Sequence, residues 1–166
     1  MEILPRGIYM AITVFLTISI LLALFFFTTK RRLHLFEGIV LWAFFLNIHN
    51  NFIGFAGVDF HLIRISQRLP NFIAYCAIRN VIFPVFIMLF LEAVASLRRT
   101  WAKLACLVVA VHLLMGIVLL AERFNVLQHS PRWTVGWSYL SWTAALLLMY
   151  GLHQWIRRVL GKDVIV

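Results

Sequence analysis

Five long apolar runs fill almost the whole chain, and short connections that carry arginine and lysine separate them. Each run is long enough to cross the hydrocarbon core of a bilayer, which takes about 20 apolar residues at helical rise. Little of the chain remains for any other structure. We therefore predict five membrane-spanning helices at residues 8–28, 37–57, 72–96, 102–121 and 134–156.

The composition excludes a water-soluble fold. Hydrophobic residues make up 63% of the 166 residues, and the mean hydropathy is +0.94. A soluble domain of this size cannot hide so much apolar surface. The sequence thus predicts an all-α, polytopic transmembrane helical bundle, with residues 1–166 forming a single transmembrane domain and no soluble domain.

The net charge of +9 has a different meaning in a membrane protein than in a soluble one. In a soluble chain it would suggest nucleic acid, whereas at the ends of membrane helices basic residues set orientation. We expect the lipid bilayer as the partner and no nucleic acid. We also expect the first span to be a retained helix, because its apolar stretch is longer than the core of a signal peptide.

Five spans place the two chain ends on opposite sides of the membrane. Nine basic residues fall on one side, namely Lys30, Arg31, Arg32, Arg98, Arg99, Lys103, Arg157, Arg158 and Lys162. Five fall on the other side, namely Arg6, Arg64, Arg68, Arg123 and Arg132. The side with more positive charge is normally cytoplasmic. This distribution predicts an outside N-terminus and a cytoplasmic C-terminus.

Sequence signals of an enzyme or a metal site are absent. The chain has no H-E-x-x-H, no G-x-S-x-G and no glycine-rich phosphate loop. Cys76 and Cys106 both lie inside predicted spans and form no C-x-x-C motif. His49 and His112 raise the alternative of a haem held between facing helices, but a single pair is a weak signal. We predict no catalytic residues, no metal and no cofactor.

Polar side chains gather in the outer halves of the second and third spans. Three asparagines of the second span share one helical face, which we expect to point into the bundle because lipid cannot satisfy amides. An arginine and an asparagine lie about two turns into the third span, at similar depth. The candidate polar pocket consists of Asn47, His49, Asn50, Asn51, Arg79 and Asn80.

Arg79 has several alternative interpretations. An arginine at the centre of a membrane helix costs about 2.5–3.5 kcal/mol, so it normally has a partner or a function. In the structural alternative it snorkels, or pairs with Asp59 or Glu122 at the outer rim. In the functional alternative it binds a small anion or a lipid headgroup, and in a third a partner protein supplies the carboxylate. Pro84 predicts a kink nearby and a free carbonyl at Asn80.

The connection at residues 58–71 has an amphipathic pattern. Leu62, Ile65 and Leu69 fall on one side of a helical turn. This pattern predicts a short helical segment that lies in the headgroup layer.

Several features of the second half occur together in one known group of proteins. They are Pro84 within the third span, the helix exit Glu122-Arg123-Phe124-Asn125-Val126-Leu127, and the spaced tryptophans Trp133, Trp137 and Trp142. Over about residues 75–158 the chain resembles a family of uncharacterised five-span integral membrane proteins of spore-forming Firmicutes. The resemblance implies a bacterial cytoplasmic membrane and supplies no activity, substrate or cofactor.

The helix exit also suggests a contact that closes the following loop. We expect Glu122 to accept a hydrogen bond from the indole of Trp133 or Trp137, or to pair with Arg132. Either contact would join the fourth and fifth spans at the outer rim.

These features favour a non-enzymatic accessory or interaction protein with an outward-facing polar pocket inside the membrane. The alternative is a small oligomeric transporter, or a membrane protein that binds a lipid or small anion. A redox or lipid-modifying enzyme is a third class. Another membrane protein or a second copy of the chain is an open alternative as partner.

Overall fold

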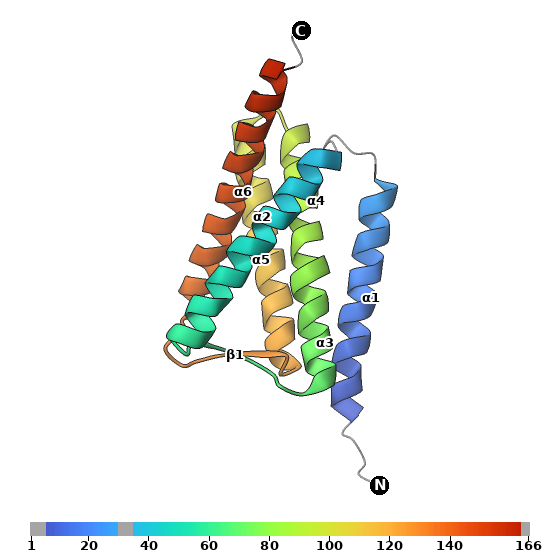
Figure 1. Ribbon diagram of the computed structural model, residues 1–166, viewed down its shortest axis with the longest axis vertical. Helices are drawn as coiled ribbons and strands as arrows, with labels where there is room; N and C mark the ends of the chain where they lie inside the picture. Colours follow the sequence, from blue (N-terminus) through green and yellow to red (C-terminus); the bar gives the residue numbers. More distant parts are fainter. Residues whose placement is uncertain (1–5, 30–34, 164–166) are drawn as a thin grey trace.

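Long helices that alternate in direction account for most of the chain (Figure 1). The computed structural model describes residues 6–29 and 35–163. In chain order the elements are α1 (Arg6–Thr28), α2 (Leu35–Ile53), η1 (Gly54–Asp59), β1 (Ile63–Ile65), α3 (Leu69–Ala77), η2 (Ile78–Ile82), α4 (Phe83–Ser96), α5 (Thr100–Arg123), β2 (Leu127–His129) and α6 (Val135–Asp163). The predicted all-α helical bundle is confirmed. Lys30, Arg31 and Arg32 of the predicted basic cluster lie outside the described residues.

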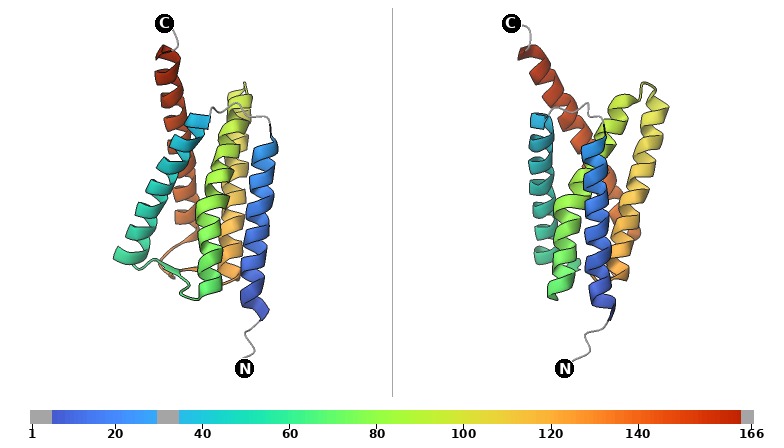
Figure 2. Two further views of the ribbon diagram at one scale, coloured as in Figure 1. Left: turned by 45° about the vertical axis from the view of Figure 1, so that its right-hand side comes forward. Right: turned by 90° about the vertical axis from the view of Figure 1, so that its right-hand side faces the viewer.

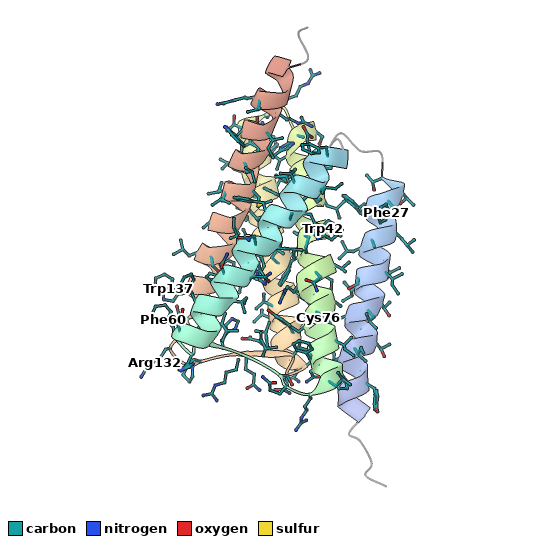
Figure 3. All side chains as sticks on the ribbon, in the orientation of Figure 1. Phe27, Trp42, Phe60, Cys76, Arg132 and Trp137 are labelled. Carbon is teal, nitrogen blue, oxygen red and sulfur yellow. The ribbon has the colours of Figure 1, made fainter. Side chains whose placement is uncertain are left out.

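The surface of the bundle identifies the chain as a membrane protein. Four helices in the described ranges are long and apolar enough to cross a membrane, namely Tyr9–Thr28, Phe36–Gly57, Leu69–Ser96 and Thr100–Arg123. Large apolar side chains lie on the outer surface of these helices and of α6, including Leu113 on α5 and Leu147 on α6. Figure 3 shows one of them, Phe27, on α1. Lipid tails accommodate such a surface, whereas water does not. The number of crossings, five, stays a prediction.

The continuous helix made by α3, η2 and α4 is the centre of the bundle. In its most apolar stretch of 18 residues, 56% of the residues are buried. In the corresponding stretches of α1 and α2 the buried share is 17%. Figure 2 shows the other helices arranged around it. Its fully buried side chains include Ile78, Ile82, Ile87, Met88 and Leu91.

A π-helical segment, η2, interrupts this central helix just before Pro84. The amide of Phe83 donates to the carbonyl of Ile78, five residues earlier instead of four. Proline has no amide hydrogen and its ring clashes with the carbonyl four residues before it. The wider turn accommodates the proline, where the sequence predicted a kink. Arg79 lies within this segment.

A two-stranded antiparallel sheet joins two connections at one end of the bundle, which we call the sheet end. Ile63 pairs with His129, and Ile65 pairs with Leu127. Two further backbone bonds extend the pairing, from Ser66 N to Val126 O at 3.1 Å and from Ser130 N to Leu62 O at 2.8 Å. The prediction of a helical turn in residues 58–71 is therefore wrong at β1. The local pattern carried no information about a strand partner so far along the chain.

The end of α5 turns the chain into this sheet. Asn125 adopts a left-handed conformation with φ of 53°. The amide of Val126 donates to Ala121 O and that of Asn125 to Glu122 O, both at 2.9 Å. This is the pattern of a Schellman motif. The side chain of Asn71, at the start of α3, donates to Asn125 O at 3.0 Å and ties the two helix ends together.

At the opposite end of the bundle an ion pair joins α2 to α6. Arg157 Nε lies 3.7 Å from Glu37 Oε1, and the Glu37 side chain is buried. Toward the sheet end α2 leans away from the central helix (Figure 2). The ion pair thus holds α2 against α6 at this end of the bundle. The other end of α2, at the sheet, lies apart from the central helix.

We predict that Asn125→Ala destabilises the protein and that Asn125→Gly does not. Both substitutions remove the bond from Gln128 Nε2 to Asn125 Oδ1, but only alanine is strained at the positive φ of this position. The strain costs about 1 kcal/mol. Thermal unfolding of both variants in the same micelles measures the difference. Equal stability of the two variants would contradict the role of the left-handed turn.

Candidate functional site

A cavity of about 280 Å³ lies between α2 and α6 near the sheet end, and we call it the lateral pocket. Its walls are mostly apolar and aromatic. The central helix, through Tyr75 and Phe83, and α5, through Val118, also contribute to its walls. The side chains on α2 and α6 that line it include Phe45, Ile48, His49, Phe52, Trp142, Ala145, Leu148 and Met149.

The sheet closes the lateral pocket at the sheet end. Ile63 of β1 and Leu127 of β2 line the pocket and are themselves buried. His129 and Trp133 complete this part of the wall. The paired strands therefore form the wall of the pocket at the sheet end.

The pocket is open toward the side of the bundle instead. Phe52 on α2 and Leu148 on α6 both line the pocket, yet they are 37% and 48% exposed. Ala144, on the same wall of α6, is also exposed. Because these residues belong at once to the pocket and to the outer surface, the mouth lies between α2 and α6, at the side of the bundle.

His49 lies in an aromatic wall of the pocket. Its ring stacks with Phe45 at a centroid distance of 5.5 Å and with Trp142 at 6.2 Å. Phe83 packs edge-on against it at 5.5 Å. The side chain is 8% exposed, and its Nε2 atom has no hydrogen-bond partner among the described residues.

Two further polar side chains, Tyr75 and Arg79, belong to the central helix. Tyr75 lines the same pocket as His49 of α2. The Arg79 charge is near enough to act on both His49 and Tyr75. The hydroxyl of Tyr75 and the Nε atom of Arg79 are both buried, and neither finds a partner of acceptable hydrogen-bond geometry in the described part of the chain. His49 of α2 and Tyr75 of α3 thus line the pocket, and Arg79 of η2 lies beside Tyr75 without lining it.

The structure separates the remaining predicted pocket residues from His49. Asn47, Asn50 and Asn51 are exposed on the outer face of α2, so the expectation that they point into the bundle is wrong. Asn51 Nδ2 donates to both Asn47 O and Asn47 Oδ1 at 3.0 Å, which satisfies part of these amides on the helix itself. Asn80 is half-buried in η2. Of the six predicted residues, His49 is the one that lines the lateral pocket.

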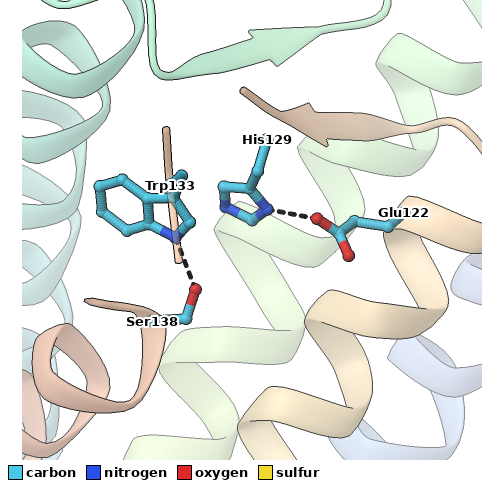
Figure 4. Close-up of polar contacts among 4 residues, drawn as sticks. All are labelled: Glu122, His129, Trp133 and Ser138. Atoms are coloured by element: carbon cyan, nitrogen blue, oxygen red, sulfur yellow. Dashed lines mark hydrogen bonds and ion pairs between the residues drawn. The ribbon is translucent and has the colours of Figure 1, made fainter. Parts of the chain in front are cut away.

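Glu122 makes a contact that the sequence did not predict. It accepts a hydrogen bond from His129 Nδ1, while the Trp133 indole donates to Ser138 Oγ at 2.6 Å (Figure 4). The His129 ring stacks on Trp133 at 5.5 Å with an angle of 12° between the planes. Glu122 therefore accepts from His129 where we expected it to accept from the Trp133 indole, and that indole donates to Ser138 instead. Asp59, the other predicted ion-pair partner, is exposed in η1.

Sequence reasoning passed over three residues that matter here. His129 is a single histidine in a loop, and its role depends on the β pairing that brings it beside Glu122. Glu37 lies at the start of the second predicted span, and Tyr75 lies between Ala74 and Cys76 in the sequence. An acidic residue buried at a helix start is a usable signal for Glu37. No local signal identifies Tyr75 or His129.

The histidines do not form a metal site in the described residues. His112 is exposed on α5, where its Nδ1 lies 2.8 Å from Val108 O and its ring contacts Tyr139. No three histidine, cysteine or acidic side chains within residues 6–29 and 35–163 are grouped to hold a metal ion. The polar side chains that line the lateral pocket, such as His49 and Tyr75, can instead donate or accept hydrogen bonds.

Comparison of the chain with known protein families, with curated proteins and with solved structures found no match. What can be said of function therefore comes from the pocket and its surroundings.

We predict that Glu122 and His129 stabilise the sheet end as a coupled pair. Single Glu122→Ala and His129→Ala variants and the double variant form a thermodynamic cycle. We expect a coupling free energy of about 1 kcal/mol, because the acceptor is a carboxyl group and the contact is partly shielded from water. Unfolding in micelles by a denaturing detergent measures each term.

A second cycle that pairs Glu122→Ala with Gln128→Ala is the control. Gln128 is adjacent to His129 but bonds to Asn125, so these two changes should be additive. Coupling of the same size in both cycles would show that the effect does not come from the contact between Glu122 and His129.

Proposed function

We propose that this protein is a non-enzymatic binding protein that takes up an amphiphilic molecule from the bilayer into the lateral pocket. The single observation that carries this proposal is the direction of the pocket. The sheet forms its wall at one end, and its exposed lining residues lie on α2 and α6, at the side of the bundle that we propose to face the bilayer. A ligand that reaches such a pocket arrives by diffusion within the membrane.

The size and lining of the pocket support a small or slender occupant. A volume of about 280 Å³ lies just below the range of roughly 300–1,000 Å³ for ligand sites. It is small for a whole two-chain lipid. A single chain can place one end among the aromatic side chains and leave the remainder in the bilayer.

We further propose that the sheet end faces outward in a bacterial cytoplasmic membrane and that all five helices cross it. In the described residues Arg98, Arg99, Arg157 and Arg158 lie at the end opposite the sheet, which supports a cytoplasmic location for that end. Trp137, Phe60 and Arg132 lie at the sheet end (Figure 3), as expected of side chains at a membrane boundary. α1 begins at the sheet end and α6 finishes at the other (Figure 1).

Blocking the pocket tests the proposed function. Ala145→Phe adds a ring to the pocket wall, while Ala105→Phe makes the same change at an exposed position of α5. We expect protein extracted from bacterial membranes in mild detergent to retain about one amphiphile per chain. Mass spectrometry of the extracted lipid should find that molecule in the wild type and in Ala105→Phe, and not in Ala145→Phe. The same lipid content in all three proteins would refute the proposal.

The exposed amides of α2 favour a second function, contact with another membrane-spanning helix. Lipid offers no hydrogen bonds, so amides on an outer face gain from a protein partner. Asn50 is exposed on the same face as the bonded pair of Asn47 and Asn51. This face supports an interaction role, with a second copy or with another protein.

Cross-linking tests this second function. In a variant without native cysteines, Asn50→Cys should form a disulfide-linked species in oxidised membranes, and the mass of that species distinguishes a homodimer from a complex with another protein. Leu147→Cys on the outer face of α6 is the control for random collision. Equal cross-linking at the two positions would argue against a specific contact at α2.

A further inference from the structure

Two buried polar groups on the wall of the lateral pocket lack partners. The His49 and Tyr75 side chains are 8% and 3% exposed, and both line the pocket. Neither His49 Nε2 nor the Tyr75 hydroxyl finds a partner of acceptable hydrogen-bond geometry among the described residues, although the Arg79 side chain lies beside that hydroxyl. A buried polar group without a partner is unfavourable, because it has lost its hydrogen bonds to water. A ligand that pairs with both groups recovers part of that cost.

Arg79 adds a positive charge behind the pocket wall, next to Tyr75 on the central helix, although it does not itself line the pocket. Its guanidinium is close enough to act on both His49 and Tyr75. Glu122 forms an ion pair with His129, and Glu37 forms one with Arg157. No carboxylate of the described part of the chain compensates Arg79. The charge therefore favours an anion at this wall and disfavours a cation.

We propose that the lateral pocket binds a long-chain carboxylic acid by its carboxylate, an inference that rests on the proposed function. The carboxylate accepts hydrogen bonds from His49 Nε2 and the Tyr75 hydroxyl, and Arg79 compensates its charge. The alkyl chain runs past Phe52 and Leu148 into the bilayer.

The geometry of the pocket agrees with this direction of binding. Its polar groups come from α2 and the central helix, whereas its exposed apolar lining lies at the mouth between α2 and α6. An amphiphile with its head inside and its tail outside matches both parts. Recognition of a carboxylate by charge-assisted hydrogen bonds is also stronger than recognition of a neutral hydroxyl.

Three ligands of the same chain length separate recognition of the head from recognition of the chain. Stearic acid, octadecanol and methyl stearate are added in equal amounts to the protein in nanodiscs of phosphatidylcholine, and native mass spectrometry gives the occupancy of each. We expect the acid to bind about tenfold more tightly than the alcohol. The ester, which has no charge and a bulkier head, should bind most weakly.

Two substitutions test the contacts. Arg79→Met removes the charge at similar length, and His49→Phe keeps an aromatic ring but removes Nε2. We expect Arg79→Met to reduce binding of the acid to the level of the alcohol and His49→Phe to reduce it partially, with alcohol binding unchanged in both. Arg64→Met removes one positive charge from an exposed position of β1 and should bind all three ligands like the wild type.

The outcomes distinguish this inference from the proposed function. Equal binding of the three ligands to the wild type would overturn recognition of the carboxylate and leave the lateral pocket in place. A preference for the acid that survives both substitutions would place the contact elsewhere and also overturn the inference. If none of the ligands binds, and Ala145→Phe retains the same extracted lipid as the wild type, both proposals fail.

Discussion

The antiparallel pairing of β1 with β2 determines the geometry of the sheet end, on which the lateral pocket depends. It joins the connection between α2 and α3 to the connection between α5 and α6. Each net backbone hydrogen bond contributes only about 1 kcal/mol, so the importance of the pairing lies in position more than in energy. It places Ile63 and Leu127 over the pocket and brings His129 to Glu122. Without this pairing, neither connection would be held in place as a wall of the pocket.

The sequence predicts the helices well because the bilayer imposes a length and a composition on each of them. The predicted first and third spans end at the same residues as α1 and α4, Thr28 and Ser96. The sheet was not predictable in this way, since its two strands lie in connections separated by two helices. The role of His129 was missed for the same reason, because its partner is defined by β pairing and not by local spacing.

The candidate site shows where a correct periodicity gave a wrong orientation. Helical spacing does place Asn47, Asn50 and Asn51 on one face of α2, as predicted, but that face is the exposed one. The aromatic face with Phe45 and His49 packs inward against Phe83 and Trp142, where stacking and burial of large rings stabilise it. The prediction assumed that amides avoid lipid because lipid offers no hydrogen bonds. It did not consider bonding between neighbouring amides on one helix, or contact with a partner.

The wide turn at η2 also sets the angular relation between the two halves of the central helix. A turn closed by a bond to the fifth preceding residue holds one more residue than an ordinary α-helical turn. Residues before and after it are therefore out of phase by one position, about 100° around the axis. A helical wheel drawn through Tyr75 and Phe83 without this offset misplaces one relative to the other by that angle. Any homologous helix without the extra residue would need a single-residue gap at this point to keep both halves superimposed.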